Sequence, residues 1–425
     1  MPVTVLPSLT MAHRIAYSVA TLLAAVCFSA VALQFFHVPF FWIGLAWALA
    51  GFVIAALGPR VLRLPITLAA WVPFALGLGE LMLPPIVEQS ELPSPYREDA
   101  LLGWRLNPSA VTRATAKIEG ELIFDVAYST DSAGFRVAPP DRSDQVEGCL
   151  LFFSDSFTFG QGVSDNQTFP YRVGLQTNGR FRVVNLAVPG YGAEQMLASI
   201  ERGTLATDPP CAPTHVFYAA LPHHIHRAAG KASFSGSGPQ YRLSPDGIPE
   251  YIGTNARPTA DSADLATWQG WHALLKVPLQ KSRILAQILQ RYRLRTTEED
   301  DIALYFAILR QAFRLLEGRW PEAERHVISW DIHSFFSNGQ ARFHKGLEAI
   351  RAEVHFIDDI LPGYTRDPAQ YGLHERDLHP NALAHEMVAS YISERILSTA
   401  RPIKTLVLQE RDDPWAEVTS DDSAE

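Results

Sequence analysis

The first 95 residues contain three long apolar stretches that carry almost no charge. They cover 15–36, 39–58 and 64–83, and the only charged residue within them is Glu80. About 20 apolar residues span the roughly 30 Å hydrocarbon core of a bilayer. The pattern therefore predicts a membrane anchor of three transmembrane helices over 1–84. A cleaved signal peptide is the competing interpretation of the first stretch, but its apolar run is longer than is typical of such peptides.

Basic residues around these stretches predict an orientation. Arg14 precedes the first stretch, and Arg60 and Arg63 lie between the second and the third. Because positively charged residues stay on the cytoplasmic side, the N-terminus is expected in the cytoplasm of a bacterial cell, with the anchor in the inner membrane. Everything after about Pro84 is then expected in the periplasm or outside the cell, and membrane lipids are expected partners.

Charge is concentrated in the rest of the chain. Residues 1–95 hold 6 of the 81 Lys, Arg, Asp and Glu residues with a net charge of zero, so the remainder carries the whole net charge of −9. This uneven distribution argues against a simple soluble enzyme, and an acidic surface gives no support to nucleic-acid binding. Three cysteines are too few for a disulfide scaffold or a cysteine-rich zinc site.

The segment after the anchor divides into three parts. A proline-rich linker and β-rich leader are expected over 85–145, followed by alternating strands and helices over 146–400, which predict an α/β domain with a parallel sheet covered on both faces. An insertion at about 231–324 is either a lid, a partner surface or decoration, and the acidic tail 401–425 is expected to be disordered. The five strands are expected at 149–153, 182–186, 215–220, 326–330 and 354–357.

Two short segments carry residues suited to nucleophilic catalysis. Ser156 follows the first buried strand, at the edge where parallel α/β sheets bind ligands. Asp377 and His379 lie immediately before the last helix. A serine nucleophile needs a base, and the base needs a carboxylate that fixes its tautomer. The chain therefore contains all three groups of a Ser-His-Asp triad.

At these residues the sequence resembles the SGNH, or GDSL-type, hydrolase superfamily, and in particular its membrane-anchored bacterial members. The resemblance rests on Ser154-Asp-Ser-Phe-Thr-Phe-Gly-Gln-Gly162, on Asn185 to Gly192, and on Asp377-Leu-His379-Pro-Asn. It implies a flavodoxin-like three-layer fold with a parallel sheet. It also implies that Ser156 is the nucleophile, that Asp377 and His379 complete the triad, and that the Ser156 and Gly190 amides hold the oxyanion. No metal or organic cofactor is implied.

The sequence departs from the family pattern in two places. Ser154 stands before Asp155 where the family pattern has a glycine. A serine is tolerated in this turn if its φ is negative. Members of the family also have a conserved segment with an Asn directly after the third strand. This chain lacks that Asn and has His223 and His224 there. We expect a His224 N–H to act as the replacement oxyanion donor, since loss of one donor typically costs ~10²–10³ in rate.

Each of these residues also has a simpler interpretation. Ser156 has an alternative interpretation as a turn residue or helix cap, and Asp377 and His379 have one as caps of the last helix. His223 and His224, with His226 nearby, suggest a metal site, but the local sequence adds no acidic or cysteine ligand to them. For Asp155, the residue before the serine, we expect a role in orienting the loop by hydrogen bonding.

Cys149 opens the first strand and Cys211 precedes the third. In the flavodoxin-like strand order 2-1-3-4-5 these two strands are neighbours. An oxidising compartment permits a bridge between them, so we expect a Cys149–Cys211 disulfide.

Taken together, the sequence predicts a membrane-anchored serine esterase that hydrolyses O-acyl or O-acetyl esters on a lipid or glycan of the bacterial envelope. An O-acyltransferase that modifies envelope polysaccharide is one alternative, and it would require an envelope-complex partner to supply the acyl donor. A catalytically weak glycan-binding or scaffold protein is the other alternative.

Overall fold

The computed structural model describes residues 40–57, 60–82, 88–118, 120–140, 146–202, 211–232, 237–254, 299–330 and 340–398, together with a few isolated positions between 11 and 21. The predicted tail 401–425 and the predicted helical part of the insertion over 274–291 lie outside these residues.

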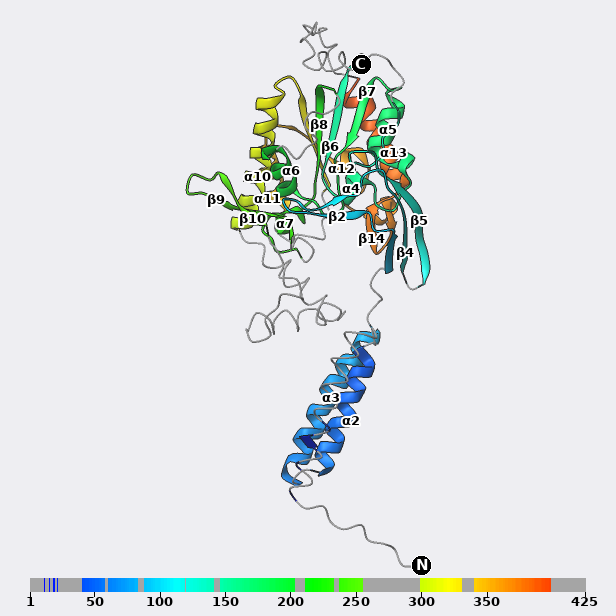
Figure 1. Cartoon of the computed structure of the whole chain (residues 1–425), viewed down its shortest axis with the longest axis vertical. Helices are drawn as coiled ribbons and strands as arrows, with labels where there is room; N and C mark the ends of the chain where they lie inside the picture. The colour runs from blue at the N-terminus through cyan, green and yellow to red at the C-terminus, as the bar shows by residue number, and fades with distance from the viewer. Residues whose placement is uncertain are drawn as a thin grey trace, which may run out of the picture.

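Two helices, α2 (Phe40–Leu57) and α3 (Arg60–Met82), pack along each other before the rest of the fold begins (Figure 1). Within the described part of the chain, no helix is both long and apolar enough to cross a bilayer. The prediction of three transmembrane helices is therefore wrong. The 18 residues of α2 rise only about 27 Å, and Arg60, Arg63 and Glu80 lie inside α3. The first predicted span, 15–36, lies almost entirely outside the described residues.

The α/β part of the prediction is confirmed by a five-stranded parallel sheet in the order β12-β11-β8-β6-β7. Numbered along the chain, this is the order 2-1-3-4-5 that was expected. Its strands, from the first to the last in sequence, are β6 (Gly148–Phe153), β7 (Phe181–Asn185), β8 (Pro213–Ala220), β11 (Glu324–Ser329) and β12 (Glu353–Phe356).

Helices cover both faces of this sheet because its strands are apolar on both faces. Leu151 and Tyr218 face a core formed with α6 (Ala193–Glu201) and α10 (Glu299–Arg319). Phe152 faces the opposite core, formed with α5 (Phe169–Gln176), α13 (Ala382–Tyr391) and the following π-helical turn Ile392–Ile396. Figure 1 shows α6 and α10 on one side of β6 and β8, and α5 and α13 on the other.

The predicted β-rich leader forms a small antiparallel sheet and a hairpin. The sheet has the order β1-β4-β5, and the hairpin pairs β2 with β3. The leader strands are β1 (Glu88–Leu92), β2 (Tyr96–Asp99), β3 (Gly103–Leu106), β4 (Val111–Ile118) and β5 (Glu121–Ser129).

Several further helices and short strands lie in the segments that connect or follow the strands of the main sheet. The insertion contains the hairpin β9–β10 and helix α10, and the end of β8 leads into α7. The bounds are α4 (Ser156–Phe159), α7 (His224–Ala228), β9 (Pro239–Leu243), β10 (Pro249–Thr254), α11 (Gln340–Glu348), α12 (Ile357–Ile360), β13 (Gly372–His374) and β14 (Asp377–Pro380), with 3₁₀ turns at Asp165–Gln167 and Pro368–Tyr371.

A disulfide joins Cys149 at the start of β6 to Cys211 just before β8, with their Cα atoms 5.5 Å apart. The two residues come together because β6 and β8 are neighbours in the sheet.

Candidate active site

The turn that carries the candidate nucleophile Ser156, called the nucleophile turn below, connects the carboxyl end of β6 at Phe153 to α4. Ser156 is the first residue of α4, and the Asp155 side chain caps this helix by accepting a hydrogen bond from the Phe157 amide at 3.0 Å. Asp155, and not Ser156, is therefore the helix cap. The Ser156 side chain remains available for chemistry at the edge of the sheet.

The second half of the site comes from β14, which pairs with β13 just before α13. Ser156 Oγ lies 2.9 Å from His379 Nε2, and His379 Nδ1 lies 2.5 Å from Asp377 Oδ1. These contacts form a continuous chain from the hydroxyl through the imidazole to the carboxylate. Asn381 caps α13 by accepting from the Ala384 amide, so capping does not explain Asp377 or His379.

Asp377 is held in its charged form. Burial alone would raise the pKa of its carboxyl, but hydrogen bonds from the His379 side chain and backbone, together with the His379 charge, lower it on balance. A carboxylate that accepts from Nδ1 leaves the lone pair of Nε2 facing the serine hydroxyl. The arrangement therefore suits His379 to take a proton from Ser156.

The loop after β7 carries Gly190, whose backbone amide the family resemblance assigns to the oxyanion hole. Gly190 has φ of 87°, a conformation that glycine adopts without strain. Leader residue Trp104 donates to the Pro189 carbonyl at 3.1 Å, and the Tyr191 hydroxyl donates to the Trp104 carbonyl. Within the described residues, no hydrogen bond uses the Ser156 or Gly190 amide. Both amides are therefore free to donate to an oxyanion.

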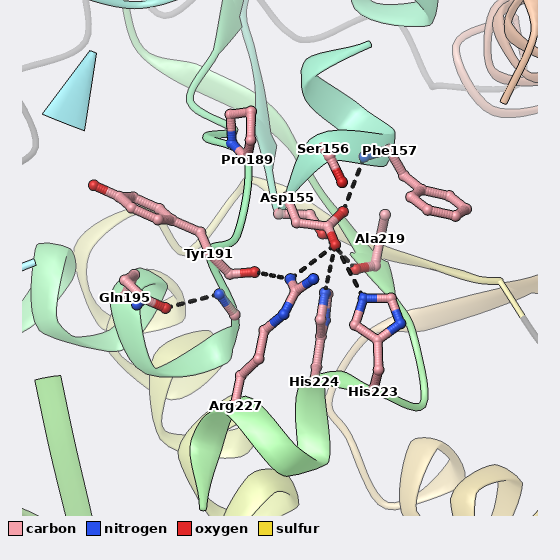
Figure 2. Close-up of polar contacts among 12 residues, drawn as sticks. Asp155, Ser156, Phe157, Pro189, Tyr191, Gln195, Ala219, His223, His224 and Arg227 are labelled. Atoms are coloured by element: carbon pink, nitrogen blue, oxygen red, sulfur yellow. Dashed lines mark hydrogen bonds and ion pairs between the residues drawn. The ribbon is translucent and has the colours of Figure 1, made fainter. Parts of the chain in front are cut away.

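Asp155 is the centre of a buried polar cluster (Figure 2). Its Oδ2 lies 2.8 Å from Arg227 Nη1, 3.1 Å from His224 Nε2 and 3.3 Å from His223 Nε2. Burial alone would raise the pKa of Asp155, but the Arg227 charge and the two histidine hydrogen bonds hold it well below its usual range. The expected role of Asp155 in orienting the loop fits these contacts.

His224 has a different position from the one expected of an oxyanion donor. Its side chain is fully buried, with Nε2 on Asp155 and Nδ1 2.8 Å from the Tyr218 hydroxyl. Both ring nitrogens are engaged inside the domain, which argues against the predicted oxyanion role of His224. His223 is the more accessible of the two, with 21% of its side chain exposed.

Arg227 is a residue that the sequence interpretation missed. Its Nη1 donates to Asp155 and also to the carbonyl oxygen of Tyr191 (Figure 2). One guanidinium therefore ties the nucleophile turn to the loop that carries Gly190. The signal for this role is weak in the sequence, because Arg227 lies 72 residues from Asp155.

Ser154 departs from the expectation of a negative φ. Its φ is 136°, in the region that favours glycine, and its hydroxyl donates to the Ala219 carbonyl at 2.7 Å. A side chain at such a backbone position costs of order 1–3 kcal/mol. The chain thus keeps the glycine conformation of the family pattern with a serine in its place.

Arg136 of the leader fixes the other side of the nucleophile turn. It is buried, and it donates to the carbonyls of Phe159, Gly160 and Val163 and to Asp165. The leader therefore holds the chain immediately after α4 in place. The sequence interpretation assigned no role to Arg136.

The histidine group after β8 includes an acidic neighbour that local sequence does not show. Asp155, His223 and His224 offer ligand atoms within 4.8 Å of one another, whereas His226 is not part of this group. Arg227 Nη1 lies 2.8 Å from the same carboxylate oxygen that a cation would use. A positive charge already neutralises Asp155, so this cluster is poorly suited to a metal ion.

Comparison with known proteins gives only distant likenesses. No protein-family model matches the chain, and no curated protein matches it. A member of the lipolytic protein G-D-S-L family from Veillonella parvula is 14% identical, with a TM-score of 0.34, over 58% of this chain and 97% of that one. The acetyl xylan esterase Est2A from Butyrivibrio proteoclasticus is 10% identical, with a TM-score of 0.31, over 73% and 97%. Likeness at this level carries no argument about the activity of this chain.

The class of the protein follows from its own geometry. The strand order 2-1-3-4-5, Ser156 at the carboxyl end of β6, and Asp377 and His379 before the last helix are the features that the sequence resemblance implied. The protein therefore has a flavodoxin-like α/β fold with Ser156, His379 and Asp377 in contact at the carboxyl edge of its parallel sheet.

Proposed function

We propose that the protein is a serine esterase of the SGNH type. The observation that carries this proposal is the chain of contacts from Ser156 through His379 to Asp377. The Ser156 and Gly190 amides make no hydrogen bond to another described residue, which leaves them available to an oxyanion. A protein that only binds ligands has no need of a serine, an imidazole and a carboxylate at these distances.

The reaction has two steps. Ser156 Oγ forms a bond to the ester carbonyl carbon while its proton passes to His379 Nε2, and the amides of Ser156 and Gly190 stabilise the oxyanion. Collapse of the tetrahedral intermediate breaks the ester C–O bond, and His379 returns the proton to the leaving alcohol. Water then loses a proton to His379 and attacks the acyl carbon. Collapse of this second intermediate breaks the C–Oγ bond, and His379 returns the proton to Ser156 Oγ as the acid leaves.

We place this activity in an oxidising compartment outside the cytoplasm. The Cys149–Cys211 disulfide supports the placement, because such bonds persist in secreted and periplasmic proteins and are rare in the cytosol. The substrate class that we propose is an O-acyl ester on an envelope glycan or lipid, on the basis of the family resemblance and this compartment.

A fluorophosphonate probe tests the proposal directly. The wild-type protein is expected to be labelled, and Ser156→Ala and His379→Gln are expected to lose labelling and to reduce kcat for an acetyl ester by ~10⁴-fold or more. Ser94→Ala, at an exposed leader position, is the matched control and should label normally. Folded wild-type protein that is not labelled would rule out a nucleophilic Ser156. Acylated sugar formed in place of free acid, when an acceptor glycan is added, would assign transfer instead of hydrolysis.

A further inference from the structure

The sequence repeats Glu-x-His in two neighbouring strands of the parallel sheet. Glu324 and His326 lie in β11, and Glu353 and His355 lie in β12. Residues two apart on a strand share a face, and the register pairs His326 with Glu353. All four side chains are therefore on one face of the sheet, near the amino-terminal ends of the strands and so at the opposite end from Ser156.

Three of these side chains bring ligand atoms to one point. His326 Nδ1 lies 3.1 Å from His355 Nε2, and Glu353 Oε2 lies 3.6 Å from His326 Nδ1. The three ligand atoms all lie within 4.8 Å of one another. Two nitrogens about 2.1 Å from a tetrahedral Zn²⁺ are roughly 3.4 Å apart, so the observed separations fit the edges of such a site.

The surroundings of the two imidazoles match the outer shell of a metal site. His355 Nδ1 lies 3.1 Å from the Tyr391 hydroxyl, which orients the ring so that Nε2 faces His326. On the other side, His326 Nε2 is buried without a hydrogen bond, and Glu324 Oε2 lies 3.7 Å away. Metal-bound histidines almost always donate their second N–H to a carboxylate or another oxygen. The Tyr391 hydroxyl already fills this place for His355, and the Glu324 carboxylate, whose side chain is 54% exposed, is available to turn toward His326 Nε2.

The protonation states of the two imidazoles are compatible with binding a cation between them. Without a metal, His326 Nδ1 and His355 Nε2 share one proton in their hydrogen bond. For a cation to bind, that proton must move to the outer nitrogen of its own ring, so that His326 Nδ1 and His355 Nε2 both offer lone pairs. Each neutral ring then carries its single proton on the outer nitrogen, His326 on Nε2 toward Glu324 and His355 on Nδ1 toward the Tyr391 hydroxyl. The Glu353 side chain is 68% exposed, so it can turn toward the ion and leave a path for entry.

We propose that His326, His355 and Glu353 bind a divalent transition-metal ion, with water as the remaining ligand. Two imidazoles and one carboxylate suit Zn²⁺ and its neighbours in the first row better than Ca²⁺ or Mg²⁺, which prefer oxygen ligands. The ion would join β11 to β12, since His326 lies in β11 and the other two ligands lie in β12. The site is at the far end of the sheet from Ser156, so it takes no part in the proposed ester chemistry.

Calorimetric titration of the untagged full-length chain with Zn²⁺ tests the proposal, and Co²⁺ absorption reports the geometry. We expect one ion per chain, a rise in Tm on binding, and Co²⁺ bands typical of tetrahedral coordination. Glu353→Gln and His355→Gln, which each remove a proposed ligand, should weaken Zn²⁺ binding by ~100-fold or more. Tyr391→Phe removes the hydroxyl that contacts His355 Nδ1 and should weaken binding by ~10–100-fold. Glu353→Gln changes an exposed side chain, so it should fold as the wild type does.

Matched controls separate this site from other sources of affinity. Glu348→Gln changes an exposed glutamate of α11 outside the cluster and should bind Zn²⁺ like the wild type. His379→Gln, which alters the candidate catalytic triad, should also retain binding. An absence of binding by the wild type, or binding unchanged in both Glu353→Gln and His355→Gln, would overturn the proposal. Binding that is lost instead in His223→Gln would place the ion at Asp155 and overturn it too.

Discussion

Arg227 Nη1 lies 2.8 Å from Asp155 Oδ2 inside the domain, and the same nitrogen donates to the Tyr191 carbonyl. The fully buried carboxylate immediately precedes Ser156, and the carbonyl immediately follows Gly190. The Arg227 guanidinium therefore links the residue before Ser156 to the residue after Gly190, and so links the two turns that carry the candidate nucleophile and the candidate oxyanion amide.

Replacement of Arg227 by methionine should destabilise the protein by about 3–5 kcal/mol, because it leaves the Asp155 charge buried without its cation. Urea unfolding measures this loss, and kcat for an acetyl ester should fall with it. Arg242→Met is the matched control, since Arg242 and Glu250 form an exposed pair that contributes little. The double variant Asp155→Asn/Arg227→Met should recover part of the stability. Equal losses in Arg227→Met and Arg242→Met would contradict the assigned role.

Arg136→Lys should destabilise the protein by about 2 kcal/mol or more, because an ammonium group cannot replace a planar fork that reaches three carbonyls and Asp165. The guanidinium also lies 4.4 Å from the centre of the Tyr128 ring and 4.5 Å from that of Phe159. Thermal unfolding and kcat are the measurements. Arg113→Lys, which alters an exposed pair with Asp125, serves as the control, and an effect of similar size there would rule out a specific role for Arg136.

The sheet and the contacts among Ser156, His379 and Asp377 could be predicted from sequence because their signals are local. Each strand of the parallel sheet is a short apolar run, and Ser156, Asp377 and His379 lie in segments with a recognisable spacing. The contacts of Arg227 and Arg136 could not be predicted in the same way. Each depends on segments that only the folded chain brings together, over 72 residues in one case and up to 29 in the other.

The predictions of transmembrane helices and of an oxyanion role for His224 do not agree with the structure. Each relied on a local sequence pattern that does not specify how long a helix becomes or where a side chain points. Apolar content suggested membrane spans, but the length and charges of the helices that form decide that question. The sequence assigns His224 as the oxyanion donor because a histidine N–H could replace the missing Asn after the third strand. Its ring instead turns into the domain, where Asp155 and the Tyr218 hydroxyl occupy both nitrogens.

The serine at position 154 predicts an ordered series of stabilities. Ser154→Ala keeps the side-chain strain at φ 136° and loses the hydrogen bond to Ala219, so it should destabilise the protein by about 1 kcal/mol. Ser154→Gly loses the same bond but relieves the strain, so it should be more stable than Ser154→Ala by about 1–3 kcal/mol. Chemical unfolding of the three proteins in parallel decides the matter. If the alanine variant equals or exceeds the glycine variant, the strain at this position is negligible.

Glu194 predicts a loss of stability as pH rises. It lies in the first turn of α6 with 1% of its surface exposed, and neither carboxylate oxygen has a hydrogen-bond partner from another described residue. Burial raises the pKa of Glu194 from 4.5 to about 7. The folded state therefore binds this proton more tightly than the unfolded state does. Stability should fall as pH rises from about 4.5 to 7, and the full penalty should remain above pH 7.

The substitution Glu194→Gln removes the titrating proton and keeps the shape of the side chain. At pH 8 it should stabilise the protein by about 3 kcal/mol, and at pH 4.5 it should have little effect. Urea unfolding across this pH range measures the difference between variant and wild type. Glu322→Gln, at an exposed position, should change stability little at either pH. A Glu194→Gln effect that stays constant from pH 4.5 to 8 would show that Glu194 does not titrate in this window.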